Sequence, residues 1–370
     1  MRFNLAELSG SMGDLGTFLP LVAGMAFVCE MDLGVILILA GIANITVGIV
    51  FGMPVPVQPM KAIAAVAVAE SLLPDQIAAA GLIVGAVMLA LGATRIVQYV
   101  EKVIPLPVVR GIQLGVGLKL MLQAVRLVAE TSWIGLDSVA VGLGAACLIV
   151  FVNRWKRSPG ALVLFAAGVV VALLETPALT RSLSIGAPEF VFILPSARSW
   201  FDGFVHGAVP QLPLTVLNSV IAVCALSGDL FPGRRIPAPT MASSVGLMNL
   251  LTCWFGAVPM CHGSGGLAGQ YYFGARSGGS MVMLGIINLT VGLVLGAAAA
   301  AIIHAYPRSF LGVMLFFAGF ELAKPARDQR GGREISITIV TAALIVGINT
   351  LVGFATGMAL AAVLSLRRTR

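Results

Sequence analysis

The sequence predicts an all-α polytopic membrane protein with 14 transmembrane segments in a 7+7 inverted repeat, including two half-helices preceded by short extended segments. Three observations predict this fold class. Hydrophobic residues make up 58% of the chain, charged residues 11%, and the mean hydropathy is +1.00, which excludes a soluble domain of this length. Two breaks rich in proline or glycine interrupt the apolar stretches. The two halves of the chain also match each other weakly in register.

The apolar segments follow one another with short connections. Those of the first half are 12–29, 33–52, 60–72, 76–98, 107–128, 137–153 and 160–175. Those of the second half are 206–228, 240–256, 264–275, 280–304, 308–323, 334–350 and 352–366. Most can cross a hydrocarbon core of about 30 Å, whereas the third and the tenth are too short. Two half-length helices in corresponding places indicate an internal repeat.

The first break, residues 54–61, reads Pro-Val-Pro-Val-Gln-Pro-Met-Lys. Its prolines remove backbone donors and block helix, so the segment is extended at a depth where lipid tolerates only helix. Such a backbone must line a cavity. The apolar run 62–69 follows directly and predicts a short helix whose free N–H groups and positive dipole end point toward Lys61. A helix start of this kind favours an anion.

Sliding the chain on itself by 205 positions places Gly41 on Gly246, Asn44 on Asn249 and Pro54 on Pro259. Residues 53–61 then fall on residues 258–266, Val-Pro-Met-Cys-His-Gly-Ser-Gly-Gly, a second break that leads into the second short segment. We therefore expect a first repeat over 1–175 and a second over 206–370. An odd number of segments inverts the second repeat, so the two half-helices enter the membrane from opposite faces and their N-termini converge.

The loop charges predict the orientation. If the N-terminus is cytoplasmic, most basic residues fall in inward loops, and this asymmetry favours both termini inside the cell. The net charge of +7 therefore indicates topology rather than nucleic-acid binding. The inward loops and tail hold Arg95, Lys102, Arg154, Lys156, Arg157, Arg234, Arg235, Arg276, Lys324, Arg327, Arg330, Arg333, Arg367, Arg368 and Arg370.

Four ordered blocks resemble the signature blocks of the molybdate transporter family, which is related to the sulfate permeases. They are Gly13-Asp-Leu-Gly-Thr-Phe-Leu-Pro20, Pro54-Val-Pro-Val-Gln-Pro-Met-Lys61, Pro210-Gln-Leu-Pro-Leu-Thr-Val-Leu-Asn-Ser219 and Gly265-Gly-Leu-Ala-Gly-Gln270. The resemblance implies one membrane transport unit over 1–370. Its core domain is expected from segments 1–4 and 8–11, about 12–98 and 206–304. Its gate domain is expected from segments 5–7 and 12–14, about 107–175 and 308–366.

The resemblance also implies a homodimer. Sulfate permeases carry a soluble C-terminal STAS domain, and we expect none here because the sequence stops just after its last apolar segment. This feature fits the shorter molybdate branch.

The residues themselves describe a receptor for a small tetrahedral anion. Lys61 inside the membrane costs about 2.5–3.5 kcal/mol, so it needs an anionic partner, water or a bound substrate. Alternatively, it snorkels to the cytoplasmic edge. The glycines of the second break suit close approach of an oxyanion or, alternatively, tight helix packing. The candidate substrate-binding residues are Thr17, Phe18, Gln58, Pro59, Met60, Lys61, Asn218, Ser219, His262, Gly263, Ser264, Gly265 and Gly266.

Asp14 and Glu321 are the candidates for carrying a coupling proton or cation, because carboxylates inside a membrane often serve proton relays. The alternatives are that Asp14 caps a helix and that Glu321 neutralises Lys119. Scattered cysteines and histidines predict no metal site, no cofactor and no enzyme. The predicted function is secondary-active import of a tetrahedral oxyanion, foremost molybdate, across the cell membrane. A sulfate transporter or a passive anion channel is the alternative. A nucleobase carrier is disfavoured because residues 210–225 and 267–275 contain no acid.

Overall fold

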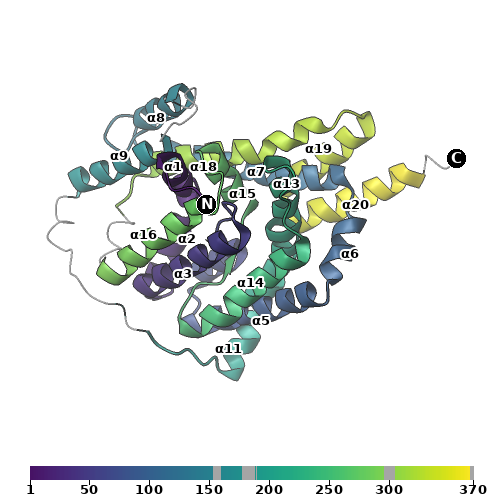
Figure 1. Cartoon of the computed structure of the whole chain (residues 1–370), viewed down its shortest axis with the longest axis horizontal. Coiled ribbons are helices and arrows are strands. Elements are labelled where there is room, and N and C mark those ends of the chain that lie inside the picture. The colour runs from purple at the N-terminus through teal and green to yellow at the C-terminus, as the bar shows by residue number, and fades with distance from the viewer. Residues whose placement is uncertain (153–159, 177–187, 189, 296–304, 367–370) are drawn as a thin grey trace.

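The computed structural model describes residues 1–152, 160–176, 188, 190–295 and 305–366, and the chain is folded almost entirely into helices (Figure 1). Five of the described helical runs are long and apolar enough to cross a membrane: Leu33–Phe51, Pro74–Ala93, Leu106–Ala129, Ala197–Leu230 and Arg308–Asp328. Shorter apolar helices lie between them. The protein is therefore an integral membrane protein, as the composition predicts.

The elements of the first half follow the predicted segments closely. They are α1 (Leu5–Ser11), the 3-10 turn η1 (Met12–Asp14), α2 (Leu15–Val28), α3 (Leu33–Phe51), β1 (Gln58–Pro59), α4 (Lys61–Glu70), α5 (Pro74–Ala93), α6 (Ile96–Val103), α7 (Leu106–Ala129), α8 (Val139–Val152) and α9 (Gly160–Glu175). Segment 76–98 is divided, because Arg95 adopts a left-handed conformation with φ 59° between α5 and α6. Helix α6 is amphipathic, with polar and apolar residues on different faces, as in a helix that lies along a membrane surface.

The second half begins with one long helical run, residues 197–230. It consists of α11 (Ala197–Asp202), the π-helix η2 (Gly203–Ala208), α12 (Val209–Leu214), the π-helix η3 (Thr215–Ala222) and α13 (Val223–Leu230). Pro213 lies inside α12, and a proline inside a helix removes a backbone hydrogen bond and widens or kinks the turn. The segment predicted at 206–228 thus starts earlier than expected and carries two wide turns, which are often found at functional sites.

The remaining elements again match the predicted ranges. They are α14 (Ala238–Thr252), the 3-10 turn η4 (Cys253–Phe255), β2 (Met260–Cys261), α15 (Ser264–Tyr272), α16 (Gly279–Leu295), α18 (Arg308–Ala323), the 3-10 turn η5 (Lys324–Asp328), α19 (Gly332–Gly347) and α20 (Thr350–Leu366). Part of the predicted segment 280–304 lies outside the described residues, which end at 295 there.

The long helices pack in pairs that join the two halves of the chain. Helix α3 lies against α16, α5 against α14, and α7 against both α18 and α19 (Figure 1). At the crossing of α7 and α18 the backbones meet at Gly117 and Gly319, where a Cβ on either glycine would lie 2.6 Å from the carbonyl oxygen of the other. Small residues allow such close approach in membrane helices, where packing rather than hydrophobicity drives association.

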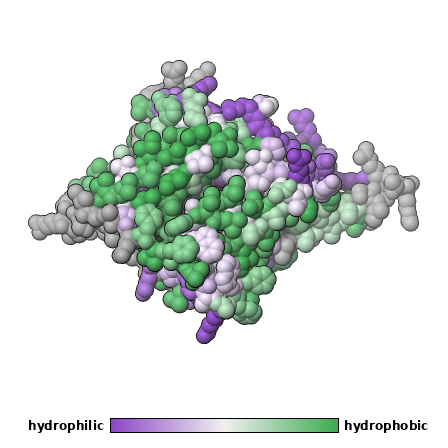
Figure 2. Space-filling view, turned by 60° about the horizontal axis from the view of Figure 1, so that its bottom comes forward, coloured by the Kyte–Doolittle hydropathy of each residue, from purple (hydrophilic) through white to green (hydrophobic). Residues whose placement is uncertain are grey.

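The outer surface is apolar across much of one face, with hydrophilic residues gathered along its edges (Figure 2). Large side chains such as Ile49 and Val50 of α3, Leu251 of α14 and Leu293 of α16 are exposed. A soluble monomer rarely exposes so large an apolar area, whereas lipid covers it in a membrane.

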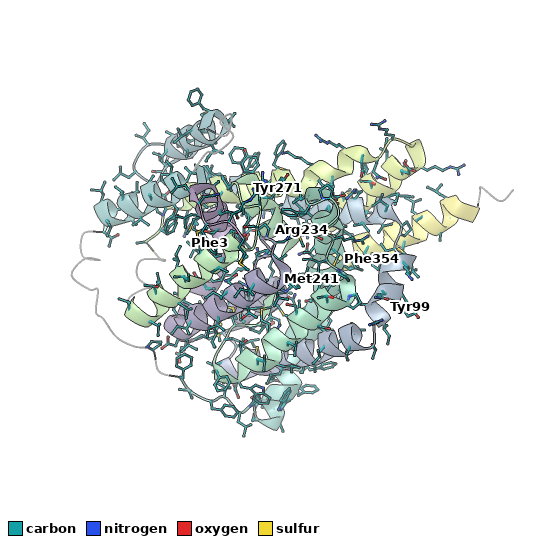
Figure 3. The ribbon with its side chains drawn as sticks, viewed as in Figure 1. Phe3, Tyr99, Arg234, Met241, Tyr271 and Phe354 are labelled. Carbon is teal, nitrogen blue, oxygen red and sulfur yellow. The ribbon has the colours of Figure 1, made fainter. Side chains whose placement is uncertain are left out.

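Loop contacts also tie the halves together. The guanidinium of Arg234, in the loop after α13, donates to the carbonyl oxygen of Gly52 at 3.0 Å (Figure 3). Gly52 ends α3 in a left-handed conformation, φ 61°. This contact holds the entrance of the first break beside the end of the long helical run.

Candidate anion-binding site

The two breaks pair with each other. Strands β1 and β2 form a short antiparallel ladder in which Gln58 lies opposite Cys261 and Pro59 opposite Met260. The N–H of Met60 extends the ladder by donating to the carbonyl oxygen of Pro259 at 2.7 Å. Because the strands run in opposite directions, α4 and α15 leave the ladder at opposite ends. The extended backbone therefore satisfies its own hydrogen bonds inside the protein, as the membrane interior requires.

Two asparagines brace this ladder. The side chain of Asn44 in α3 accepts from the N–H of Val57 at 3.3 Å. In α14, Asn249 accepts from the N–H of Met260 and donates to its carbonyl oxygen, both at 2.7 Å. These are the residues that the 205-position shift places on each other. Each half thus supplies one buried amide that holds a break in its extended form.

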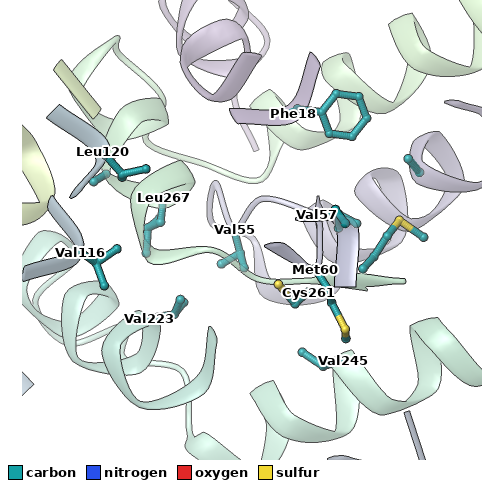
Figure 4. Packing of buried hydrophobic residues seen from close by; sticks show 14 of the residues in the cluster. Phe18, Val55, Val57, Met60, Val116, Leu120, Val223, Val245, Cys261 and Leu267 are labelled. Atoms are coloured by element: carbon teal, nitrogen blue, oxygen red, sulfur yellow. The ribbon is translucent and has the colours of Figure 1, made fainter. Parts of the chain in front are cut away.

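Apolar side chains seal the ladder. Val55, Val57 and Met60 are at most 1% exposed, and Figure 4 shows them enclosed by side chains from surrounding helices, including Val116 and Leu267. Of the predicted residues, Phe18 joins this apolar cluster and Thr17 is buried on the same helix, α2. Pro59 and Met60 contribute backbone to the ladder. The polar groups at its ends are consequently shielded from bulk water.

The start of α4 carries Lys61 at its first position. The side-chain oxygen of Gln211 in α12 accepts from the N–H of Ala62 at 2.8 Å and from that of Ile63 at 3.4 Å. The Gln211 amide in turn donates to Thr215 at 2.9 Å. A positive side chain next to the positive end of a helix dipole is electrostatically unfavourable without a counter-charge. Because Gln211 accepts from the N–H groups of Ala62 and Ile63, these backbone donors of α4 are capped. The contribution of α4 to an anion site is therefore the Lys61 ammonium.

The start of α15 differs. Its N-cap, Gly263, provides no side-chain cap, and within the described residues no hydrogen bond uses the backbone N–H of Ser264, Gly265 or Gly266. The hydroxyl of Ser264 donates to the side-chain oxygen of Asn218 at 2.5 Å. A helix start with unpartnered N–H groups is a ready anion site.

Asp14 lies directly beside this helix start. Its carboxylate is 5% exposed and accepts a hydrogen bond from the side-chain amide of Gln58. A Cβ built on Gly266 would lie 2.8 Å from both Cγ and Oδ1 of Asp14, so the absence of a side chain makes room for the carboxylate. Among the described residues no ion pair within 4.0 Å joins Asp14 and Lys61, so the attraction between their charges acts at longer range. Gln58 leaves its side-chain oxygen buried without a partner in the structure.

Two further predicted polar residues, His262 and Ser219, are buried next to the paired breaks. Both ring nitrogens of His262 are engaged: Nδ1 with the carbonyl oxygen of Pro56 at 2.9 Å and Nε2 with the hydroxyl of Ser244 at 3.0 Å. Its ring thus supports the first break from the second. Ser219 of η3 is buried and follows Asn218 directly. The side chain of Glu321, the second coupling candidate, lies outside the described residues.

Sequence reasoning missed Gln211 and Cys261 as members of this site. Gln211 occurs in a segment that reads simply as a membrane span, and Cys261 reads as a packing residue. The one local feature that could have indicated a role for Gln211 in the site is its polar side chain between Pro210 and Pro213. Among the described residues no group of three or more His, Cys, Asp or Glu side chains is placed to hold a metal ion.

Comparison with known proteins identifies the lineage. Residues 6–120 and 203–322 match the family described as "Molybdate transporter of MFS superfamily". The chain belongs to the molybdate transporter family. It is 41% identical to Molybdate transporter 1 of Arabidopsis thaliana, over 99% of this chain and 89% of that protein. It is 32% identical to Molybdate transporter 1 of Chlamydomonas reinhardtii, over 95% of this chain and 90% of that protein. The resemblance inferred from the four sequence blocks is confirmed.

Solved structures share the fold of this molybdate transporter family member. SLC26A9 superposes with a TM-score of 0.63 at 13% identity, over 99% of this chain and 66% of that chain. The transmembrane domain of the cyanobacterial bicarbonate transporter BicA superposes with a TM-score of 0.57 at 15% identity, over 96% and 98%. The family is one of transporters, so the prediction of a transporter rather than an enzyme is also confirmed.

Proposed function

We propose that this protein imports molybdate across the cell membrane by secondary-active transport. One observation carries the proposal: the pairing of the two breaks brings Lys61, at the start of α4, and the bare start of α15 to one short ladder, with Asp14 beside Gly266. Lys61 supplies the fixed charge, and the N–H groups of Ser264, Gly265 and Gly266 supply neutral donors. Amide donors and one cation suit a tetrahedral oxyanion. The names of the relatives support molybdate as that oxyanion.

The proposed mechanism is alternating access of an inverted repeat. Its support is that equivalent helices pack in the same way across the two halves. The 205-position shift places α3 on α14 and α5 on α16, and in the structure α3 packs on α16 while α14 packs on α5. These four helices with α2, α4, the 197–230 run and α15 form the proposed core domain. The proposed gate domain comprises α7–α9 and α18–α20. We place both termini in the cytoplasm on the loop charges, and a homodimer stays a prediction of the resemblance.

Uptake into proteoliposomes tests this function. We expect saturable accumulation of labelled molybdate above its external concentration, abolished when the ion gradients are collapsed. Equilibration without accumulation would instead identify a passive anion channel, and absence of any oxyanion uptake would contradict transport altogether. Competition by unlabelled anions measures the preference between substrates. If unlabelled sulfate inhibits the uptake of labelled molybdate more strongly than unlabelled molybdate does, the protein is a sulfate transporter.

Asp14 is the proposed carrier of a coupling proton. When ionised, it is the counter-charge of Lys61 and repels a dianion arriving at the α15 start. When protonated, it leaves Lys61 available to the substrate. Binding of the proton and of the oxyanion would then favour each other, which is the requirement for symport.

The variant Asp14→Asn mimics the protonated form. We expect molybdate binding and molybdate-for-molybdate exchange to persist, while accumulation driven by a proton gradient falls to equilibration. Glu130→Gln is the matched control, because Glu130 is an exposed carboxylate paired with Arg308 at 3.4 Å. Accumulation by Asp14→Asn at the parental level would exclude Asp14 from coupling.

A further inference from the structure

A buried arginine joins two parts of the chain outside the anion site. Arg110 lies near the start of α7, and its side chain is 7% exposed. All five of its N–H donors are used. Two go to Asp229 at 2.5 and 3.0 Å, two to Asp328 at 2.6 and 3.0 Å, and one to Gln113 at 3.0 Å. Bidentate pairing of this kind is specific to arginine, since a lysine ammonium is a point charge with three donors.

The carboxylates of Asp328 and Asp229 belong to different packed units of the protein. Asp328 ends η5, which follows α18 directly, and both α18 and η5 pack on α7. Asp229 belongs to α13, which continues η3 without interruption. Asn218 of η3 is the residue that holds Ser264 at the start of α15. The Arg110–Asp328 pair therefore lies within one packed unit, whereas the Arg110–Asp229 pair connects that unit to the helix that reaches the anion site.

A cavity of about 330 Å³ adjoins this pair. Its walls include Arg110 and Val109 of α7 on one side and Ile221, Ala225 and Asp229 of the long helical run on the other. Ala225 and Asp229 lie four positions apart on α13 and share a face, and Ile221 belongs to η3, the π-helix that also carries Asn218. The cavity therefore lies between the start of α7 and the long helical run that carries Asn218.

We propose that Arg110 and Asp229 form the inner gate of the transport pathway, a proposal that rests on the division into core and gate domains made above. In the state described here the pair forms part of the cavity wall and joins α7 to α13. When the core moves, Arg110 keeps its hydrogen bonds to Asp328 and loses those to Asp229. The two guanidinium N–H groups that bound Asp229 then face the cavity without a partner. These donors then face the departing oxyanion, which gives the pathway a second, transient anion contact at its cytoplasmic end.

Thiol labelling from the cytoplasmic face tests the gate. Cys147 is the exposed cysteine, and the other four are buried, so Cys147→Ser provides the background and Ala225→Cys the reporter. The probe is a membrane-impermeant sulfonated maleimide, applied to inside-out vesicles. We expect Asp229→Asn to raise the labelling rate about tenfold, within the range of ordinary conformational coupling. Asp328→Asn should raise it less, because Asp229 still holds Arg110.

Controls separate the gate from a purely structural ion pair. Glu130→Gln removes an exposed pair and should leave the rate unchanged, and the background without Ala225→Cys should not label. Arg110→Lys keeps the charge but cannot hold both carboxylates, so an intermediate rate is expected even if Asp229→Asn fails to reach the membrane. If Asp229→Asn and Arg110→Lys both leave the labelling rate of Ala225→Cys unchanged, the proposal that Arg110 and Asp229 form a gate is wrong. Molybdate binding by the Cys147→Ser background is measured separately, and its absence would count against the anion site rather than the gate.

Discussion

Replacing Lys61 by alanine is expected to weaken molybdate binding at least about 30-fold while leaving a folded protein. Removing one partner of a buried charge pair costs about 2 kcal/mol or more, and about 1.4 kcal/mol corresponds to a tenfold change in affinity. Lys61 is the cation at the start of α4, next to the ladder that joins the two breaks. Without it, the site retains a carboxylate and neutral donors, which disfavours a dianion.

The measurement is a titration of detergent-solubilised protein with molybdate, beside size-exclusion chromatography as the test of folding. Lys102→Ala is the matched control, because Lys102 lies exposed on α6. Lys61→Arg should retain part of the affinity, since it keeps the charge in a larger side chain. Parental affinity in Lys61→Ala would assign the lysine to membrane anchoring and move the anion site elsewhere.

Gly266→Ala is expected to lower molybdate uptake about tenfold or more. The new Cβ would overlap the amide nitrogen of Gln58 and lie 2.8 Å from two atoms of the Asp14 carboxyl group. Either the Asp14–Gln58 pair or the start of α15 must then shift. Inserting a methyl group into a packed site costs about 1–3 kcal/mol, and here the displaced groups are those that surround the proposed anion.

Uptake and thermal stability should be measured together for this variant. Gly144→Ala is the control: Gly144 is also helical, but a Cβ there meets no atom within 4 Å. That substitution should leave uptake unchanged and raise helix stability by up to about 1 kcal/mol. If both variants transport equally, the space beside Gly266 is unimportant and the anion does not use the start of α15.

Much of the fold was predictable from the sequence because its signals are local. Apolar runs predicted the positions of the described helices to within a few residues, apart from α1, α6 and the longer 197–230 run. Prolines 54, 56 and 59 predicted an extended break, since each blocks helix by its own stereochemistry. The register match of Asn44 with Asn249 anticipated that both would occupy equivalent places, and each braces one break.

The candidate site was only partly predictable. Lys61 and the glycines of the second break stood out because charge and bare backbone are unusual in a membrane span. Gln211 did not, although it caps α4 from 149 residues away. This cap makes the two helix starts unequal: α4 presents a charge, and α15 presents free N–H groups. The charge and the glycines are visible in the sequence, but no local pattern encodes the Gln211 cap.

The sequence by itself determined the membrane class, the family, the helix limits and the two breaks, because hydropathy, proline stereochemistry and motif order are properties of neighbouring residues. Tertiary structure decided that β1 pairs with β2, that Asp14 meets Gln58 beside Gly266, and that Arg110 holds Asp229 and Asp328. These contacts join residues from 44 to 218 positions apart. Their partners are selected by the packing of whole helices, so they exist only once the chain has folded.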